Sequence, residues 1–468
     1  MSDKLSRRNF IKKGAIGAAS IAAMGSFSAF GSSHLPEVNW QGPKSMAERV
    51  TGDEWVPPEG FEEVAEMIDK PLRVFNMGGM KFDPATAEGQ KVFNEKTGIE
   101  VEPIEVPSPV ALPKETTVLS SRAPEPVMMQ VPAELYLGFV EPGWLEPTCE
   151  LWDDATLEYY SKSWSTDMLT DIDSTRDVNC QYGTFAITEL QLFHWRPDLL
   201  EEAGLDPAEF EDPTWDDIDR VGEALQGSDR YVFAVNGQPA RFLPQAFLPF
   251  VWAQGGTIWE DGNVVFNSDE GLTAVEKLIE WVDNGYMPNP GTTDQSDVPT
   301  MFLAGKSVGA FHPTDLVGQA FDELGEENYM VTQPLMGTTG PDPQRANMEV
   351  PDNLCINTFA SEERKLAAKI YADYRRSRQQ QVMEFLMETN FPGVSTAWQD
   401  EEVLASKFAP VSGELEEAIT YARAGLFPRY NVIADRLGTE IGNALAGGKS
   451  AQQALDDAQA YVDDALGQ

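Results

Sequence analysis

The chain has 468 residues, of which 42% are hydrophobic and 10% aromatic, enough apolar material for two domains with packed cores. Its 76 acidic residues outnumber its 34 basic residues, so the net charge is −42, and the acids are spread along the whole chain. This composition excludes a disordered acidic tail, and it disfavours nucleic acid and anionic membranes as partners.

The charge also predicts the conditions under which the protein folds. A net charge this large repels itself at low ionic strength, whereas roughly 1 M salt shortens the Debye length to about 3 Å. Because the acidic excess is spread over the expected helices and loops, we interpret the chain as salt-adapted, the protein of a halophile. The same field favours a neutral or cationic ligand over a multiply charged anion.

The first 31 residues have the pattern of an export signal. A charged segment, Ser6-Arg7-Arg8-Asn9-Phe10-Ile11-Lys12, precedes an apolar and small-residue run over residues 15–30. The paired arginines and their flanks resemble a twin-arginine (Tat) signal, so the Tat translocase is an expected partner. The first cysteine is Cys149, so no lipid anchor is expected. We expect an exported protein, periplasmic or at the cell surface; cleavage of the signal stays open.

An arm over residues 32–70 comes next, with room for short helices near 43–50 and 59–68. Regular structure begins with a strand at 72–75 and a turn at 76–79, followed by a helix from Pro84 to about Lys96 that Gly98 ends. Another strand begins at Ile99. A strand, a helix and a strand joined by short loops predict a parallel, right-handed crossover, whose ligands bind beyond the carboxyl ends of the strands.

The sequence also predicts three later helices. Asn267 can cap the first, which Gly285 ends and whose shared face carries Val275, Leu278, Ile279 and Val282. Ser361 can start the second. Ser450 opens the last with a capping box, and its apolar stripe is Leu455, Ala458, Val462 and Leu466. Strands and helices alternate, which predicts an α/β fold.

The sequence contains no recognisable motif of catalysis or metal binding. The sequence has no phosphate-binding loop, no G-x-S-x-G elbow and no H-E-x-x-H. The alternating acids of 171–177 place Arg176 where a calcium loop needs glycine. Three histidines are too few for a His-rich metal site. Of the three cysteines, Cys149 and Cys180 could pair, but buried free thiols are the favoured interpretation. No catalytic residue, metal or cofactor is expected.

Several segments, in order from about residue 71 to the end, resemble one family. Their similarity lies in order and spacing, and no single motif is specific. The segments are Lys96-Thr97-Gly98-Ile99-Glu100-Val101, Trp195 to Leu205, Asp212-Pro213-Thr214-Trp215-Asp216-Asp217, Gln254-Gly255-Gly256, Met301 to Lys306, Asn390-Phe391-Pro392 and Leu445 to Ala458. Together they resemble extracellular solute-binding proteins of ABC importers (family 1), the group that includes maltose- and other sugar-binding proteins.

The resemblance implies a periplasmic-binding-protein-like fold (type II). Each of its two lobes is expected to hold a mainly parallel sheet flanked by helices. Lobe 1 would span 70–186 and 350–392, and lobe 2 would span 187–349 and 393–468. A hinge between the lobes would close on a solute, most readily a mono- or oligosaccharide. The implied partners are that solute and the membrane permease subunits of the importer, and the protein is expected to be a monomer.

The same resemblance, together with strand-end positions, selects the expected solute-contacting residues. Sugars need aromatic plates and a few polar side chains. The expected residues are Trp252, His312, Asp315, Asn76, Gln130, Tyr182, Asp352, Asn353 and Phe391. The chain departs from the family pattern at residues 122–127, at Arg196, and at Pro351-Asp352-Asn353, where a Gly-Gly is frequent. These departures lie near strand ends, so they affect the choice of solute more than the fold.

Two alternatives stay open on sequence grounds. One is a binding protein for a polyamine or another small cationic solute, which the acidic field favours. The other is an extracellular carbohydrate-active enzyme on a similar frame; the absence of a recognisable nucleophile, metal or cofactor motif opposes it.

Overall fold

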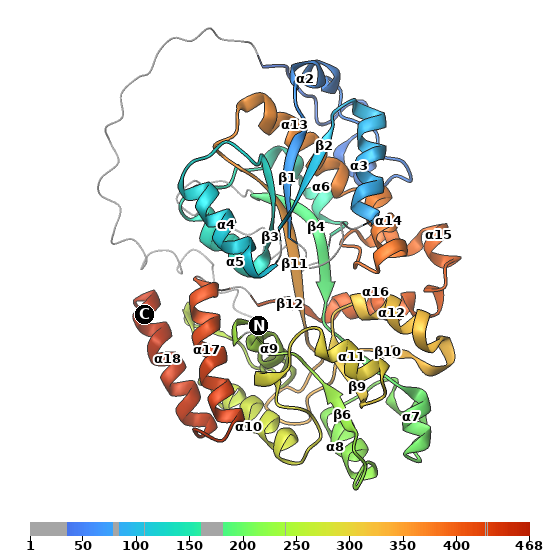
Figure 1. Ribbon diagram of the computed structural model, residues 1–468, viewed down its shortest axis with the longest axis vertical. Helices are drawn as coiled ribbons and strands as arrows, with labels where there is room; N and C mark the ends of the chain where they lie inside the picture. The colour runs from blue at the N-terminus through green and yellow to red at the C-terminus, as the bar shows by residue number, and fades with distance from the viewer. Residues whose placement is uncertain are drawn as a thin grey trace, which may run out of the picture.

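Two sheets form the framework of the molecule (Figure 1). The computed structural model describes residues 35–77, 84–106, 108–160, 181–238, 240–425, 427 and 429–468. The strands of the first sheet are β1 (Leu72–Met77), β2 (Val101–Val106), β3 (Met128–Pro132), β4 (Gly183–Leu190), β11 (Asn347–Ile356) and β12 (Ala422–Ala424). Those of the second are β5 (Leu192–Trp195), β6 (Tyr231–Ala234), β9 (Ser307–His312) and β10 (Met330–Thr332). We call the halves built on them lobe 1 and lobe 2.

The first sheet has the order β12-β11-β3-β1-β2, and β4 pairs with the other edge of β11. β1 is parallel to β2 and β3, which confirms the parallel crossover predicted from residues 72–101. β11 is antiparallel to β3 and to β4, so β4 runs in the same direction as β1, β2 and β3. The carboxyl ends of these four strands therefore lie at one edge of the sheet.

The second sheet is mixed, unlike the mainly parallel sheet that was expected. Its order is β10-β5-β9-β6, and only β6 and β9 are parallel. The mixed pairing follows from the direction in which the chain enters lobe 2. A single residue separates the end of β4 from the start of β5, and β5 runs away from lobe 1. Because β9 runs toward lobe 1, β5 and β9 must pair antiparallel.

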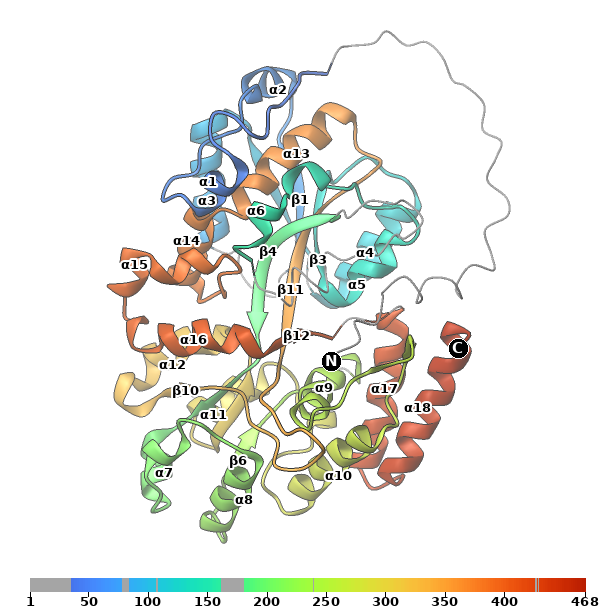
Figure 2. The same ribbon diagram turned by 180° about the vertical axis from the view of Figure 1, so that it is seen from behind.

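Helices flank both sheets, which confirms the two-lobed α/β fold (Figures 1 and 2). Those of lobe 1 are α1 (Met46–Thr51), α2 (Phe61–Met67), α3 (Pro84–Thr97), α4 (Ser108–Ser120), α5 (Ala133–Val140), α6 (Asp154–Leu157), α13 (Glu362–Arg375) and α14 (Arg378–Glu388). In lobe 2 they are α7 (Pro197–Glu202), α8 (Trp215–Ala224), α9 (Leu243–Ala253), α10 (Asp269–Asp283), α11 (Asp297–Leu303), α12 (Asp315–Leu324), α17 (Tyr430–Leu445) and α18 (Ala451–Leu466). The short α15 (Glu401–Leu404) and α16 (Ser412–Ala418) lie beside the junction, and β7 (Trp259–Glu260) and β8 (Asn263–Val264) form a hairpin.

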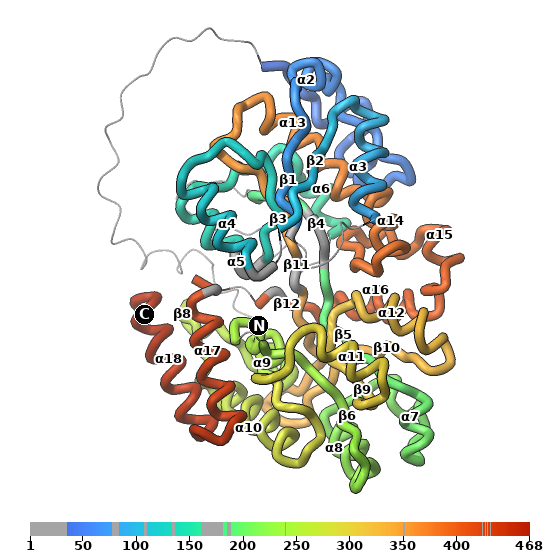
Figure 3. The backbone as a smooth tube through the Cα atoms, viewed as in Figure 1, coloured from blue at the N-terminus to red at the C-terminus, as the bar shows by residue number. Residues whose placement is uncertain are grey.

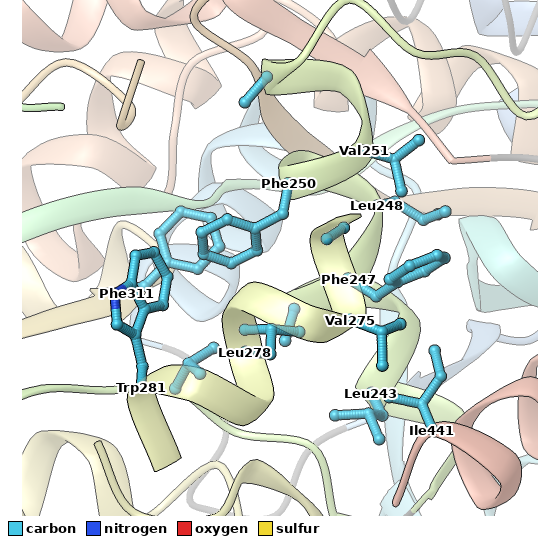
Figure 4. Close-up of a cluster of buried hydrophobic side chains, with 14 of the residues drawn as sticks. Leu243, Phe247, Leu248, Phe250, Val251, Val275, Leu278, Trp281, Phe311 and Ile441 are labelled. Atoms are coloured by element: carbon cyan, nitrogen blue, oxygen red, sulfur yellow. The ribbon is translucent and has the colours of Figure 1, made fainter. Parts of the chain in front are cut away.

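The core of lobe 2 is built around α9, which is buried along its whole length (Figure 4). Phe250 of α9 packs against Trp281 of α10, with ring centroids 5.5 Å apart, and against Phe311 of β9 at 6.1 Å. Trp281 also donates a hydrogen bond from Nε1 to Asp219 Oδ1 at 2.8 Å. A helix that is apolar all round, apart from Gln245, is typical of the interior of a domain.

The arm that precedes the first sheet is anchored to lobe 1 by a fully buried ion cluster. Arg49 of α1 places Nε 2.9 Å from Asp373 Oδ2, and Arg376 places Nη2 2.6 Å from Oδ1 of the same carboxylate. Trp55 Nε1 donates to Asp373 Oδ2 at 3.0 Å. All four side chains are 0% exposed. The arm is thus part of the folded lobe, and its two helices match the predicted ones.

The helix ends agree with most of the sequence predictions. Gly98 and Gly285 have φ values of 72° and 73°, left-handed conformations that suit glycine just after a helix. The expected cap of α10 is wrong by one residue, because Ser268 Oγ, not Asn267, accepts the N–H of Gly271 at 3.1 Å. Ser450 caps α18 by accepting from Gln453 N–H.

The cysteines differ from expectation. Cys149 is disulfide-bonded, so the interpretation as buried free thiols is wrong for Cys149. Cys355 is a buried free thiol on β11, as expected. Cys180 lies outside the described residues, as does the expected export signal over residues 1–31.

Candidate functional site

The carboxyl ends of β1, β2, β3 and β4 in lobe 1 face the carboxyl ends of β6 and β9 in lobe 2. β4 ends at Leu190, at the same edge as β1, β2 and β3, and β5 begins at Leu192 directly opposite His312, the last residue of β9. Gln191 is the single residue between them, and its N–H donates to Met348 O of β11 at 3.0 Å. Two antiparallel segments thus cross side by side between the lobes (Figure 3). In α/β folds this is the edge at which ligands bind.

Lobe 1 contributes polar side chains from β1, β3 and β11. Gln130 is 6% exposed and donates from Nε2 to Oδ2 of the partly exposed Asp352 at 2.6 Å. The pairing of β11 with β4 shifts register between Asp352 and Asn353, and such bulges re-aim side chains near functional sites. Asn353 is 2% exposed, and Asn76 lies partly exposed near the end of β1. Four of the expected residues therefore lie on neighbouring strands.

Lobe 2 contributes the end of β9 and the start of α12. His312 is 0% exposed, and its Nε2 lies 3.3 Å from Oδ1 of Asp315, whose side chain is 36% exposed. Behind it, His194 of β5 bonds to the carbonyl oxygen of His312 at 2.9 Å and to Tyr329 Oη at 2.8 Å. His312 and Asp315 thus lie together at the carboxyl edge of this sheet.

Three expected residues lie elsewhere. Tyr182 precedes β4, at its amino end, is 3% exposed, and donates its N–H to Tyr136 Oη at 2.8 Å. Phe391 is 3% exposed and packs on Trp398, with ring centroids 4.9 Å apart. Trp252 is 3% exposed within the core of lobe 2, and the guanidinium of Arg423 lies 5.7 Å from its ring centroid. Their rings are covered by protein.

Sequence reasoning missed three polar residues at the junction. Gln191 Oε1 and Thr314 Oγ1 are buried and have no hydrogen-bond partner among the described residues. The third, Glu115, is 1% exposed and projects from α4 between the buried Ala111 and Leu119. Burial, together with nearby Asp352, raises the pKa of Glu115 to about 8. The spacing 111/115/119 was a usable signal, because it puts a carboxyl within an apolar helix stripe.

Two absences concern only the described residues. Within the ranges given above, no three His, Cys, Asp or Glu side chains are grouped to hold a metal ion. None of the helices in those ranges is long and apolar enough to cross a membrane.

Solved structures share this architecture and define the class of two-lobed periplasmic binding proteins. Maltose-bound MalE3 of T. maritima superposes with a TM-score of 0.73 at 20% identity, covering 84% of this chain and 99% of its own. UgpB of Mycobacterium tuberculosis with glycerophosphocholine gives 0.71 at 17%, covering 86% and 99%. A ribitol complex of an ABC transporter solute-binding protein from Agrobacterium radiobacter gives 0.69 at 17%, covering 85% and 100%.

The sequence itself identifies the family. The model of the bacterial extracellular solute-binding protein family matches residues 91–409, more than half of the chain. The protein therefore belongs to the bacterial extracellular solute-binding proteins. Comparison with curated protein sequences finds no match.

Proposed function

We propose that this protein captures a small neutral solute, foremost a mono- or oligosaccharide, between its lobes and delivers it to the permease subunits of an ABC importer. One observation carries the proposal: the carboxyl ends of both sheets, with their polar side chains, face each other across Gln191. The structural relatives named above, two of which hold a sugar or a polyol, support this choice of solute.

The division proposed from the sequence has lobe 1 at 70–186 and 350–392 and lobe 2 at 187–349 and 393–468. The sheets shift these bounds, because β4 ends at Leu190, β11 begins at Asn347, and the short β12 joins the sheet of lobe 1. Closure is a rotation about the two crossing segments, and the solute favours the closed state through the contacts that both lobes make with it. Asn76, Gln130, Asp352 and Asn353 are the proposed contacts of lobe 1. In lobe 2 the proposed contact is Asp315, with the buried His312 acting through it. Trp252, Tyr182 and Phe391 would contribute only if closure uncovered their rings.

A panel of solutes tests the proposal directly. Maltose, ribitol, glycerophosphocholine and spermidine would each be added to the purified full chain in 2–3 M NaCl, and the melting temperature recorded. Ligand at 100 times its Kd stabilises the native state by about 2.7 kcal/mol, so a bound solute is expected to raise the melting temperature by several degrees. A response to spermidine alone would favour the polyamine alternative. No response to any sugar or polyol would count against the proposal.

The proposal assigns no catalysis to the protein. Incubating the protein with a responding solute is expected to return that solute unchanged, as judged by chromatography. Formation of a product would instead favour the carbohydrate-active enzyme. The proposed setting is exported and monomeric, with the Tat translocase as the route of export.

Salt adaptation is a further part of the proposal. With 76 acidic and 34 basic residues, at least 42 acids have no basic side chain to pair with one to one. Lowering the salt from 3 M to 0.05 M lengthens the Debye length from below about 3 Å to more than 10 Å, so repulsion then reaches across the surface. We expect far-UV circular dichroism to show loss of cooperative folding in low salt. Retention of a sharp thermal transition there would contradict the adaptation.

A further inference from the structure

Asp315 differs from the other polar residues of the lobe 2 edge in being accessible. It is the first residue of α12, three residues beyond the end of β9. Its side chain is 36% exposed although its Oδ1 is buried, so the exposed part consists of Oδ2 and the side-chain carbons. With Oδ1 buried, Oδ2 is the oxygen of this partly exposed aspartate that can accept a hydrogen bond from a solute at the binding edge.

A rigid support lies behind this carboxylate. His312 is fully buried, and its Nε2 lies 3.3 Å from Asp315 Oδ1. His194 Nε2 bonds to the carbonyl oxygen of His312, so this nitrogen must carry the proton, and Nδ1 must accept from Tyr329. Burial lowers the pKa of His194 to about 3, so it stays neutral and keeps this arrangement over the working pH range. The backbone of His312 is thereby held in place.

We propose that Asp315 is a solute-contacting, specificity-determining residue that selects hydroxyl-rich, non-anionic solutes, and that His312 is the positioning residue that holds its carboxylate. This inference rests on the function proposed above and names the solute class. Two buried polar atoms lie close by in the chain or the sheet and have no partner among the described residues. Thr314 Oγ1 belongs to the residue before Asp315, and Gln191 Oε1 belongs to the residue before Leu192, which pairs with His312.

The charge around Asp315 also opposes an anionic solute. In the described ranges, His312 is the basic group that pairs with this carboxylate, and no Lys or Arg does so. The titratable groups that face Asp315 there are His312 and His194, with Tyr329 behind His194. Burial would raise the pKa of Asp315, but His312 outweighs it and holds that pKa below its usual value. The carboxylate therefore remains an acceptor in mildly acidic solution.

The test measures binding of maltose and ribitol by isothermal titration calorimetry, with the full chain in 2–3 M NaCl. Asp315→Asn is expected to weaken binding of the responding probe by roughly tenfold or more, because a hydrogen bond to a charged acceptor is lost. Ribitol 5-phosphate is expected to bind the wild type at least tenfold more weakly than ribitol, and Asp315→Asn to narrow this gap. Asp322→Asn, on the exposed face of the same helix with a 67% exposed side chain, is the matched control and should leave the affinity unchanged.

The role of His312 needs a readout beyond affinity. Without His312, the pKa of Asp315 should rise, so His312→Gln is expected to move the acid limb of the binding profile to higher pH. Asp315→Asn should remove that limb. A purely structural role for His312 would weaken binding at every pH without moving the limb, and that result would refute positioning.

Two failures can be told apart. If the wild type binds neither probe, the proposed function fails and this inference with it. If the wild type binds but Asp315→Asn binds equally well with an unchanged pH profile, the inference alone is refuted. Thermal unfolding of each variant shows whether it is folded; a misfolded Asp315→Asn is replaced by Asp315→Ser, for which the same outcomes apply.

Discussion

Replacing Asp373 by asparagine is expected to lower the free energy of unfolding by roughly 3–5 kcal/mol, because it leaves two buried guanidinium groups without a counter-charge. Arg49 and Arg376 both contact this carboxylate, and every member of the cluster is fully buried. Burial would raise the pKa of Asp373, but Arg376 and then Arg49 outweigh it and lower that pKa. Urea denaturation in 2–3 M NaCl, followed by tryptophan fluorescence, measures the loss.

A matched control removes one carboxylate at the surface instead of in the buried cluster. Asp322 pairs with Lys407 at the surface, where their side chains are 67% and 48% exposed. Exposed pairs contribute about 0–1 kcal/mol, so Asp322→Asn should be nearly neutral. A loss of less than about 1 kcal/mol for Asp373→Asn would show that the arm is not held by this cluster.

Stability is expected to fall as the pH rises through the titration of Glu115. The pKa of this carboxyl is about 8 in the folded protein against its ordinary 4.5, so the native state holds a proton that the unfolded chain releases. The resulting stabilisation is complete below pH 4.5 and is lost as the pH rises through about 8. Its full size is roughly 5 kcal/mol at most, from about 1.4 kcal/mol for each pKa unit.

Glu115→Gln tests this expectation because the amide is isosteric and neutral at every pH. The difference in unfolding free energy between variant and wild type should grow in favour of the variant from pH 5 to pH 9. Groups remote from Glu115 titrate equally in both proteins and cancel in that difference. A difference that does not change with pH would mean that Glu115 ionises normally inside the lobe.

Much of the fold could be predicted because local patterns determine it. Caps, glycine and apolar runs predict α3 (Pro84–Thr97), which Gly98 ends, and the parallel strands on either side of it. These local signals agree with the packing of lobe 1. The mixed pairing of lobe 2 could not be predicted. The direction of β5 depends on its continuity with β4 in another sheet, and no signal within residues 192–195 reports it.

The residues of the candidate site also divide into those that the sequence could predict and those that it could not. His312 and Asp315 could be placed at a strand end, because they end and follow a strand whose direction was known. Asp352 lies inside β11 and was selected from the family resemblance alone. Trp252 was expected to face a solute from its helix. Gln245 is the one polar residue of α9, so the periodicity of this helix cannot tell which side lies against protein. Gln191 was invisible for another reason: it interrupts an apolar stretch that reads as one strand, and only the pairing partners reveal two.

The junction at Gln191 has a mechanical consequence. Two extended segments that run in opposite directions and are bonded to each other form a flat ribbon, which twists and bends easily but resists sliding. Gln191 N–H to Met348 O is one of the bonds that hold the ribbon together. We therefore expect the lobes to rotate about this ribbon without shifting past each other, so that successive openings and closings would bring the same two edges back into register.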